Sequence, residues 1–301
     1  MSMRPFRKTA AVLAATFLLL LCISAPAQQP KAAENKHCLW KVSSPGNTVY
    51  LFGSVHLLKA SDYPLDKSIE KAFENSSRVF FEINLDAVDE QKVQQLTIAK
   101  SRYSGGQTLK DAVSRQTYEL ARKRMADLGL NIEQFERVKP WFLAITLDVL
   151  ELQKLGFDQS QGIDNYFYEK AKRTSKKVDG LETAEYQLNL LGDMPAAMQE
   201  TLLLQTMTDL DDVQKEMASI VELWKSGDAD GLDALLLKSF RDYPDIYKMF
   251  VVDRNSNWLP KIESLIGQKD NVMIIVGSAH LVGKDGIIAM LKQKGYQIEQ
   301  L

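Results

Sequence analysis

Cysteine and histidine are both scarce in this chain of 301 residues, which has two cysteines and three histidines. One cysteine, Cys22, lies in an apolar stretch near the N-terminus, and Cys38 is the only thiol in the rest of the chain. A single thiol cannot form an internal disulfide, so the stability of the protein must come from its hydrophobic core. Paired CxxC motifs and an HExxH helix, which are specific signatures of zinc sites, are both absent.

Basic clusters are missing from the sequence as well. The formal charge is −2 at pH 7, and the lysines and arginines form no patch. We therefore expect neither nucleic acid nor an anionic membrane surface as a partner. No glycine-rich phosphate loop and no GxSxG nucleophile elbow occurs, so neither of these two common site types is predicted.

Only one long apolar run occurs, and it lies at the N-terminus. Three basic residues between positions 4 and 8 precede the run 10–23, and Ala25 and Ala27 provide small side chains at the −3 and −1 positions of a cleavage site. This pattern predicts a secretory signal peptide, residues 1–27, because the run is shorter than the ~20 residues that a membrane span needs. The alternative is an N-terminal anchor that is not cleaved.

Removing residues 1–27 from 301 leaves 274, and the loss of three cations changes the formal charge from −2 to −5. Cys22 does not mark a lipoprotein, because the bulky Leu21 stands where lipid attachment requires a small residue. We therefore expect a periplasmic or secreted protein, cleaved after Ala27 and without a stable membrane anchor after cleavage. Nothing in the sequence indicates the oligomeric state.

After a loose segment, 28–36, the rest of the chain, 37–301, is predicted to form a single α/β domain. Residues 38–56 have the pattern of two strands joined at the turn-forming Pro45-Gly46-Asn47, and 78–85 has that of a third strand. The stretch before the third strand has apolar residues at helical spacing. Strand, helix and strand in this order predict a βαβ unit with parallel strands.

Long helical stretches follow the third strand. Apolar residues recur at helical spacing over about 86–174 and 184–265, on either side of a short strand at 175–183. A fully apolar strand at 271–282, a further helix and a last strand at 296–301 complete the chain. The predicted fold is therefore α/β, with a mostly parallel sheet and a long helical insertion.

Two of the three histidines follow strands in the same local context. GSVH ends at His56, GSAH ends at His280, and a leucine follows both. Glycine makes up 16 of 301 residues, so a glycine three places before a given histidine is expected about once in nineteen. Ligands bind at the carboxyl ends of parallel strands, and neutral imidazole is the commonest protein ligand for transition metals. Neighbouring strands would let both rings share a metal; the alternative is two structural histidines bonded to loop carbonyls.

The third strand, VFFEINL, supplies a carboxylate for the same site. Glu82 lies in an apolar run, where an ionised side chain is costly unless it is paired or metal-bound. With His56 and His280 it makes a set of two nitrogens and one carboxylate that leaves an open position for water. Glu82 can instead be the general base that deprotonates this water, or a structural partner of a neighbouring cation. Strand alternation places Asn84 on the same face.

Three further positions carry weaker signals. Asp164, which follows the apolar helix, and Glu182, which ends the short returning strand, can both face the same pocket. Arg254 on a late helix can hold a substrate carboxylate or stabilise a developing oxyanion. A helix cap, a surface charge or a structural ion pair explains each of the three equally well.

The chain resembles the TraB/PrgY/GumN family, which is related to the Tiki proteases. The likeness rests on LWKVSSPGNTVYLFGSVHLL, FFEINL, GIDNYF and VDGLET, and on RN followed by MIIVGSAHLVGKDGI, which together span about 39–301. The resemblance implies an erythromycin-esterase/ChaN-like fold, in which two sheet-containing halves bring the GxxH loops together. It also implies metal-dependent hydrolysis, with His56 and His280 as metal ligands, Glu82 as ligand or base, and Arg254 as a catalytic residue.

We therefore predict an exported metal-dependent hydrolase that acts on a peptide or protein substrate, with Mn, Co or Zn at its site. Two alternatives stay open. The helical insertion can line a groove that binds a peptide or small ligand without cleaving it, or a histidine can act as general base without a metal.

Overall fold

The computed structural model of the chain describes residues 36–240 and 243–301. The predicted signal peptide, 1–27, and all but the last residue of the segment 28–36 lie outside the described residues. In the part of the chain that the structure describes, no helix is both long enough and apolar enough to cross a lipid bilayer.

One six-stranded sheet organises the described residues. Its strands are β1 (Leu39–Ser43), β2 (Thr48–Ser54), β3 (Arg78–Ile83), β4 (Lys177–Glu182), β5 (Val272–Gly277) and β6 (Ile298–Gln300). They lie in the order β4-β3-β5-β2-β1-β6. The first four in this order are parallel, and β1 is antiparallel to both of its neighbours. The expected α/β class with a mostly parallel sheet is therefore confirmed.

The turn residues that predicted the first two strands also tie them to the rest of the sheet. At Pro45-Gly46-Asn47 the chain reverses, and the Ser44 amide donates to the Asn47 carbonyl at 2.9 Å. The side-chain nitrogen of Asn47 donates to the carbonyls of Leu265 at 2.9 Å and Asp270 at 2.7 Å, just before β5. β5 is buried along its whole length, as a central parallel strand covered on both faces should be.

The order of the strands brings the two histidine motifs together. β5 lies between β2 and β3, so the predicted βαβ unit has parallel strands that are not adjacent. β2 and β5 pair directly, with Gly53 opposite Val276 and Ser54 opposite Gly277. The carboxyl ends of these two strands therefore lie level, at the same edge of the sheet. Both GxxH loops thus follow adjacent strands of one sheet in the described residues, and not two sheet-containing halves as the resemblance implied.

Helices fill every connection between the strands except the turn from β1 to β2. α2 (Lys67–Glu74) lies between β2 and β3, and α14 (Ile287–Gln293) between β5 and β6. The connection from β3 to β4 contains α3 (Glu90–Ser101), α4 (Leu109–Ala112), α5 (Arg115–Asp127), α6 (Pro140–Lys154) and α7 (Ile163–Arg173). The connection from β4 to β5 contains α8 (Ala184–Gly192), α9 (Ala196–Asp209), α10 (Val213–Lys225), α11 (Ala229–Phe240), α12 (Pro244–Tyr247) and α13 (Asp253–Leu265).

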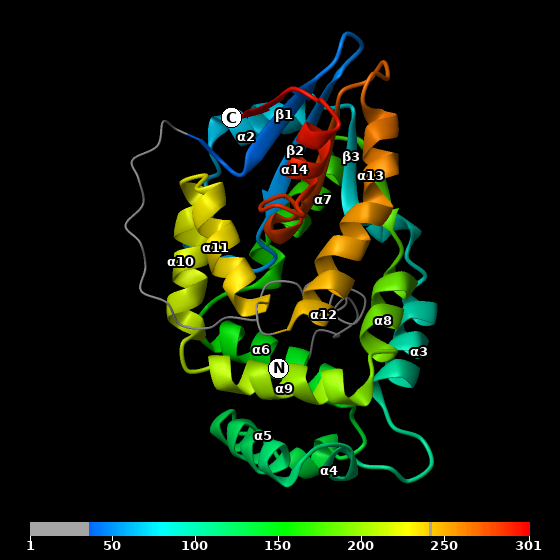
Figure 1. Cartoon of the computed structure of the whole chain (residues 1–301), viewed down its shortest axis with the longest axis vertical. Helices are drawn as coiled ribbons and strands as arrows, with labels where there is room; N and C mark the ends of the chain where they lie inside the picture. The colour runs from blue at the N-terminus through cyan, green and yellow to red at the C-terminus, as the bar shows by residue number, and fades with distance from the viewer. Residues whose placement is uncertain (1–35, 241–242) are drawn as a thin grey trace.

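These two helical connections pack against each other as well as against the sheet. α6 contacts α9, α5 contacts α9, and α3 contacts α8, so each contact joins one connection to the other. Figure 1 shows α6 and α9 running across the molecule below the sheet, with α4 and α5 beyond them, while α10 and α11 lie on one side and α13 and α8 on the other. The helices therefore surround the edge of the sheet at which the histidine loops begin.

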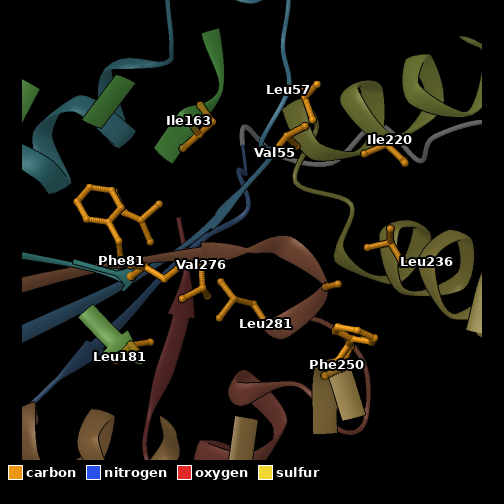
Figure 2. Packing of buried hydrophobic residues seen from close by; sticks show 14 of the residues in the cluster. Val55, Leu57, Phe81, Ile163, Leu181, Ile220, Leu236, Phe250, Val276 and Leu281 are labelled. Carbon is orange, nitrogen blue, oxygen red and sulfur yellow. The ribbon is translucent and has the colours of Figure 1, made fainter. Parts of the chain in front are cut away.

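Apolar side chains at the strand ends fix the loops that carry the histidines. Phe81 of β3, Leu181 of β4 and Val276 of β5 are buried, and so are Val55 and Leu57 in the loop after β2 (Figure 2). Interiors packed this closely hold side chains and backbone in one arrangement. The loop after β2 thus has a fixed path, although it has no regular secondary structure.

Candidate functional site

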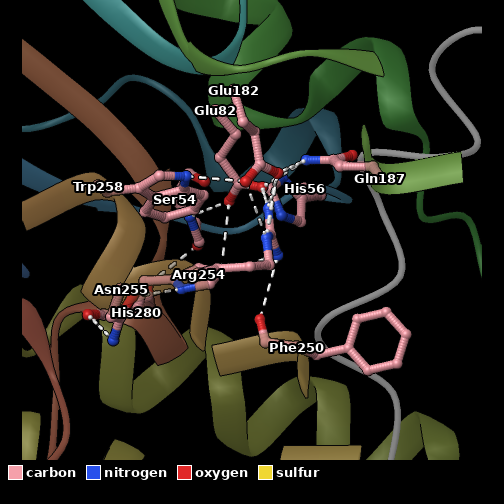
Figure 3. Close-up of polar contacts among 12 residues, drawn as sticks. Ser54, His56, Glu82, Glu182, Gln187, Phe250, Arg254, Asn255, Trp258 and His280 are labelled. Carbon is pink, nitrogen blue, oxygen red and sulfur yellow. Dashed lines mark hydrogen bonds and ion pairs between the residues drawn. The ribbon is translucent and has the colours of Figure 1, made fainter. Parts of the chain in front are cut away.

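The predicted site residues come together at the carboxyl ends of the strands (Figure 3). His56 lies two residues beyond β2, and His280 ends the 3₁₀ turn Ser278–His280 that follows β5. Glu82 is the residue before the last of β3, and Glu182 is the last residue of β4. The four side chains are between 0% and 7% exposed, so the site is buried in this structure.

Three of these groups converge on the α-carbon of Gly277. A methyl group built there would lie 3.3 Å from His56 Nε2, 3.4 Å from Glu82 Oε1 and 3.7 Å from His280 Cδ2. The Gly277 amide also donates to Glu82 Oε1 at 2.9 Å. These distances are at or near ordinary van der Waals contact, so the backbone at Gly277 marks the point where two imidazoles and a carboxylate meet.

The glycine of the first motif allows the two motifs to pack against each other. A methyl group on Gly53 would lie 2.7 Å from Ser278 Oγ. The Ser278 hydroxyl donates to the Ser54 carbonyl at 3.0 Å, and the indole of Trp224 donates to the Gly53 carbonyl at 2.7 Å. The two GSxH segments thus pack against each other and are joined by a hydrogen bond.

The ring of His56 is held by Asp164. Asp164 Oδ2 lies 2.6 Å from His56 Nδ1, and the Ser54 hydroxyl donates to Asp164 Oδ1 at 3.1 Å. Burial acts to lower the pKa of His56, but the charge and hydrogen bond of Asp164 outweigh it, and the net effect raises the pKa to about 9. His56 Nε2 is buried and has no hydrogen-bond partner among the described residues.

Helix α7 brings Asp164 to this position because it begins against the His56 loop. The Ile163 amide donates to the Val55 carbonyl at 3.1 Å. Gly162, the residue before the helix, passes so close that a methyl group on it would lie 2.0 Å from the His56 carbonyl oxygen. In the segment GIDNYF, the glycine therefore allows close contact with the His56 loop, and the aspartate binds the His56 ring.

The ring of His280 is held by Asn255 in one tautomer. The Asn255 side-chain nitrogen donates to the carbonyls of His280 at 3.1 Å and Asp285 at 2.9 Å, so its oxygen faces His280 Nδ1 at 2.7 Å and accepts from it. Nε2 then accepts from Arg254 Nη1 at 3.1 Å. Burial and the nearby Arg254 charge both lower the pKa of His280, so the ring is neutral. It packs on Trp258, with ring centroids 4.4 Å apart.

Arg254 is buried between two glutamates. Its Nη2 donates to Glu82 Oε2 at 2.6 Å and to Glu182 Oε1 at 2.7 Å, and its Nε donates to Glu182 Oε1 at 3.0 Å. Its Nη1 also donates to the Phe250 carbonyl at 3.2 Å. Burial on its own would raise the pKa of Glu82. The opposing effects, of which the positive charge of Arg254 is the largest, are stronger, so the pKa of Glu82 is lowered. For Glu182 the effect of burial is larger than the opposing effect of the Arg254 charge, so the pKa of Glu182 is raised.

Two residues that the sequence did not single out complete this network (Figure 3). The Gln187 amide donates to Glu182 Oε1 at 2.8 Å and to Glu82 Oε2 at 3.2 Å, and the Trp258 indole donates to Glu182 Oε2 at 2.8 Å. Trp258 lies four positions after Arg254, the spacing of neighbours on one helix face, which is a signal that the sequence contains. Gln187 carries no such signal.

Asn84, which strand alternation was expected to place on the same face as Glu82, lies beyond the end of β3. β3 ends one residue before it, and Asn84 caps the 3₁₀ turn Leu85–Ala87 by accepting from the Asp86 amide at 3.0 Å. Its side-chain nitrogen donates to the Val178 carbonyl of β4 at 3.2 Å. Alternation of side chains applies within a strand, and here the strand has already ended.

The donor atoms suit a metal in kind, because they are two imidazole nitrogens and a carboxylate oxygen. Both imidazoles have Nδ1 bound to a carboxylate or amide oxygen, an arrangement that is usual for metal-bound histidines. His56 Nε2 has no partner among the described residues, and Glu82 Oε1 accepts from Gly277. His280 Nε2 is engaged by Arg254. Within the described ranges, no group of three or more histidine, cysteine and acidic side chains is arranged to hold a metal ion.

Comparison with known proteins identifies the family of the chain. The model of the TraB/PrgY/gumN family matches residues 38–300. The chain belongs to this family. Its two GxxH motifs and the glutamate strand all lie within the matched residues.

Among curated proteins, the uncharacterized protein YbaP of Escherichia coli (strain K12) is 23% identical over 265 residues, which cover 87% of this chain and 96% of YbaP. Metalloprotease TIKI2 of Danio rerio is 21% identical over 315 residues, and that of Xenopus tropicalis is 22% identical over 323 residues. These alignments cover 87% and 90% of this chain, but only 60% and 61% of the TIKI2 proteins. No solved structure gave a significant match.

Replacing Gly162 with alanine should displace the His56 loop. The new methyl group would overlap the His56 carbonyl oxygen, which belongs to the backbone and cannot rotate away. We expect a loss of about 1–3 kcal/mol of unfolding free energy, as for other overpacked sites, and a change in the ¹⁵N resonances of His56 in histidine-labelled protein.

Gly129→Ala is the control, because Gly129 has a φ of +73° but open space around its α-carbon. This variant should lose about 1–2 kcal/mol through backbone conformation alone and leave the His56 resonances unchanged. Unchanged His56 resonances in Gly162→Ala would show that the contact does not position the ring.

Proposed function

We propose that this protein is a metal-dependent hydrolase that cleaves peptide bonds, with His56, His280 and Glu82 at the metal. The observation that carries the proposal is the convergence of these three side chains at Gly277, with each imidazole fixed through Nδ1. The distant likeness to proteins named metalloproteases supports it. We also propose, from the family resemblance, that the sheet and its helical connections correspond to the erythromycin-esterase/ChaN-like arrangement.

A bound Mn, Co or Zn ion would supply a Lewis acid and a source of hydroxide, by lowering the pKa of its water from 15.7 toward about 7. The residues of this chain have separate tasks around it. Asp164 and Asn255 would keep the rings of His56 and His280 oriented with Nε2 toward the metal. Their contacts with Nδ1, at 2.6 and 2.7 Å, are present in the structure.

Glu82 can act in either of the two ways that the sequence left open. Its Oε2 is bound to Arg254, so Oε1 is the atom available to a metal or to the proton of an attacking water. Arg254 places a guanidinium beside this carboxylate, where it can stabilise negative charge that develops on the substrate carbonyl.

Two alternatives rest on specific observations. The His56–Asp164 pair, whose Nε2 has no partner among the described residues, is also the arrangement of a general base and its orienting carboxylate. Such a base would act without a metal once the ring, with its pKa of about 9, has lost its proton. A protein that only binds a peptide or small ligand is the other alternative, because the buried network of Arg254, Glu82 and Glu182 satisfies most of its own hydrogen bonds.

Metal content and peptide cleavage separate these functions. Untagged wild-type protein should contain about one Mn, Co or Zn ion per chain, and His56→Ala and His280→Ala should lose it. The third histidine provides the matched control, because His37 pairs with Asp66 at 3.4 Å and lies outside the site. His37→Ala should keep the metal. Chelation should abolish peptide cleavage, and Glu82→Gln should reduce it by about 10²–10⁴-fold.

Each alternative has its own outcome in the same experiment. Sub-stoichiometric metal that is unchanged in both histidine variants would contradict the metal site. Cleavage that resists chelation but is lost in His56→Ala would identify the metal-free base. Ligand binding that survives chelation and Glu82→Gln, without turnover, would identify a binding protein.

We also propose that the protein works outside the cytoplasm, in the periplasm or after secretion, which would limit its substrates to exported peptides or envelope proteins. The support is the N-terminal pattern of a basic start, an apolar run and small residues ending at Ala27. Cell fractionation and N-terminal sequencing should find a soluble chain that starts at Gln28. A full-length protein in the membrane fraction, still starting at Met1, would contradict this.

A further inference from the structure

One of the three proposed metal ligands is not available in this structure. A neutral imidazole has one nitrogen that donates and one that accepts. His280 donates through Nδ1 to Asn255, so Nε2 holds its single lone pair in the ring plane, and Arg254 Nη1 lies 3.1 Å from it. The same lone pair cannot bind a guanidinium N–H and a metal ion. The contact between Arg254 and His280 and the metal site therefore exclude each other.

The guanidinium has other partners that would hold it without this contact. Its Nε and Nη2 donate to Glu182 at 3.0 and 2.7 Å, and Nη1 also donates to the Phe250 carbonyl at 3.2 Å. Glu182 is not one of the proposed ligands. It is itself fixed by Gln187 and Trp258, each at 2.8 Å. Arg254 can therefore give up His280 and keep a buried, charge-paired position.

We propose that Arg254 competes with the metal for His280 Nε2, and that metal binding moves Nη1 from His280 while the guanidinium stays on Glu182. This inference rests on the proposed metal site. Two effects would weaken metal binding. The guanidinium occupies the lone pair of His280 Nε2, and its positive charge, which is only 3% exposed, repels a metal cation at the same place. The metal affinity of the wild-type protein is then lower than its three ligands alone would give.

Calorimetric titration of metal-free protein with Mn²⁺ tests the competition. Arg254→Met removes the charge and the donors, and it should bind Mn²⁺ at least about tenfold more tightly than wild type. Arg78→Met is the matched control, because Arg78 is also paired with a carboxylate, Asp179 at 2.6 Å, but lies at the opposite end of β3 from Glu82. Its Mn²⁺ affinity should equal that of wild type.

Arg254→Met leaves two buried glutamates without their cation, which can prevent folding. A second variant therefore controls for this effect. Arg254→Met combined with Glu182→Gln removes one of these charges and should also bind Mn²⁺ more tightly than wild type. Equal or weaker affinity in both Arg254 variants, with Mn²⁺ still bound by wild type, would overturn the competition but leave the proposed metal site intact. Mn²⁺ binding by none of the proteins would overturn both.

A crystal structure of wild-type protein with Mn²⁺ tests, without any substitution, whether Arg254 releases His280 when the metal binds. It should show the ion on His56 and His280, Arg254 Nη1 beyond hydrogen-bond distance of His280 Nε2, and the Arg254–Glu182 pair retained. An ion bound to both histidines with the present 3.1 Å contact intact would overturn the inference.

Discussion

The site depends on one buried cation held between two carboxylates. Arg254 lies in α13, Glu82 in β3 and Glu182 in β4, so their ion pairs join a late helix to the carboxyl ends of two strands. Charges in a protein interior are tolerated only when they are paired and hydrogen-bonded, and breaking such a pair costs about 3–5 kcal/mol. This requirement fixes α13 against the sheet, and with it Asn255, the next residue along, which orients His280.

Close approach of backbone is the second constraint. Gly53 and Gly277 stand in adjacent parallel strands, and each faces atoms of the other histidine motif or of Glu82 where a β-carbon would be. In the first GxxH motif the glycine permits the contact, because a β-carbon on Gly53 would lie 2.7 Å from Ser278 Oγ. In both motifs the histidine three residues later reaches the shared edge. The same requirement recurs at Gly162, where α7 meets the His56 loop. Sheet order and glycine positions together explain why two segments more than 200 residues apart form one site.

The local part of this structure could be predicted from the sequence, and the long-range part could not. The turn at 45–47, the apolar strand β5 and the glutamate in an apolar strand are local signals, and they led to the strands, the α/β class and the candidate residues that meet at the strand ends. The insertion of β5 between β2 and β3 depends on pairing between distant segments, so the sequence did not reveal it. Gln187 lies in a helix without distinctive features, and only the folded chain brings it to Glu82 and Glu182.

The central claim is that two distant histidines serve one metal, and a chain with only three histidines allows a direct measurement. Histidine-selective ¹⁵N spectra should be recorded while the diamagnetic ion Zn²⁺ is added to metal-free protein. The account predicts that the Nε2 resonances of His56 and His280 move together and saturate at about one equivalent, while those of His37 stay in place. Shifts confined to His37, or shifts of His56 and His280 at different equivalents, would contradict it.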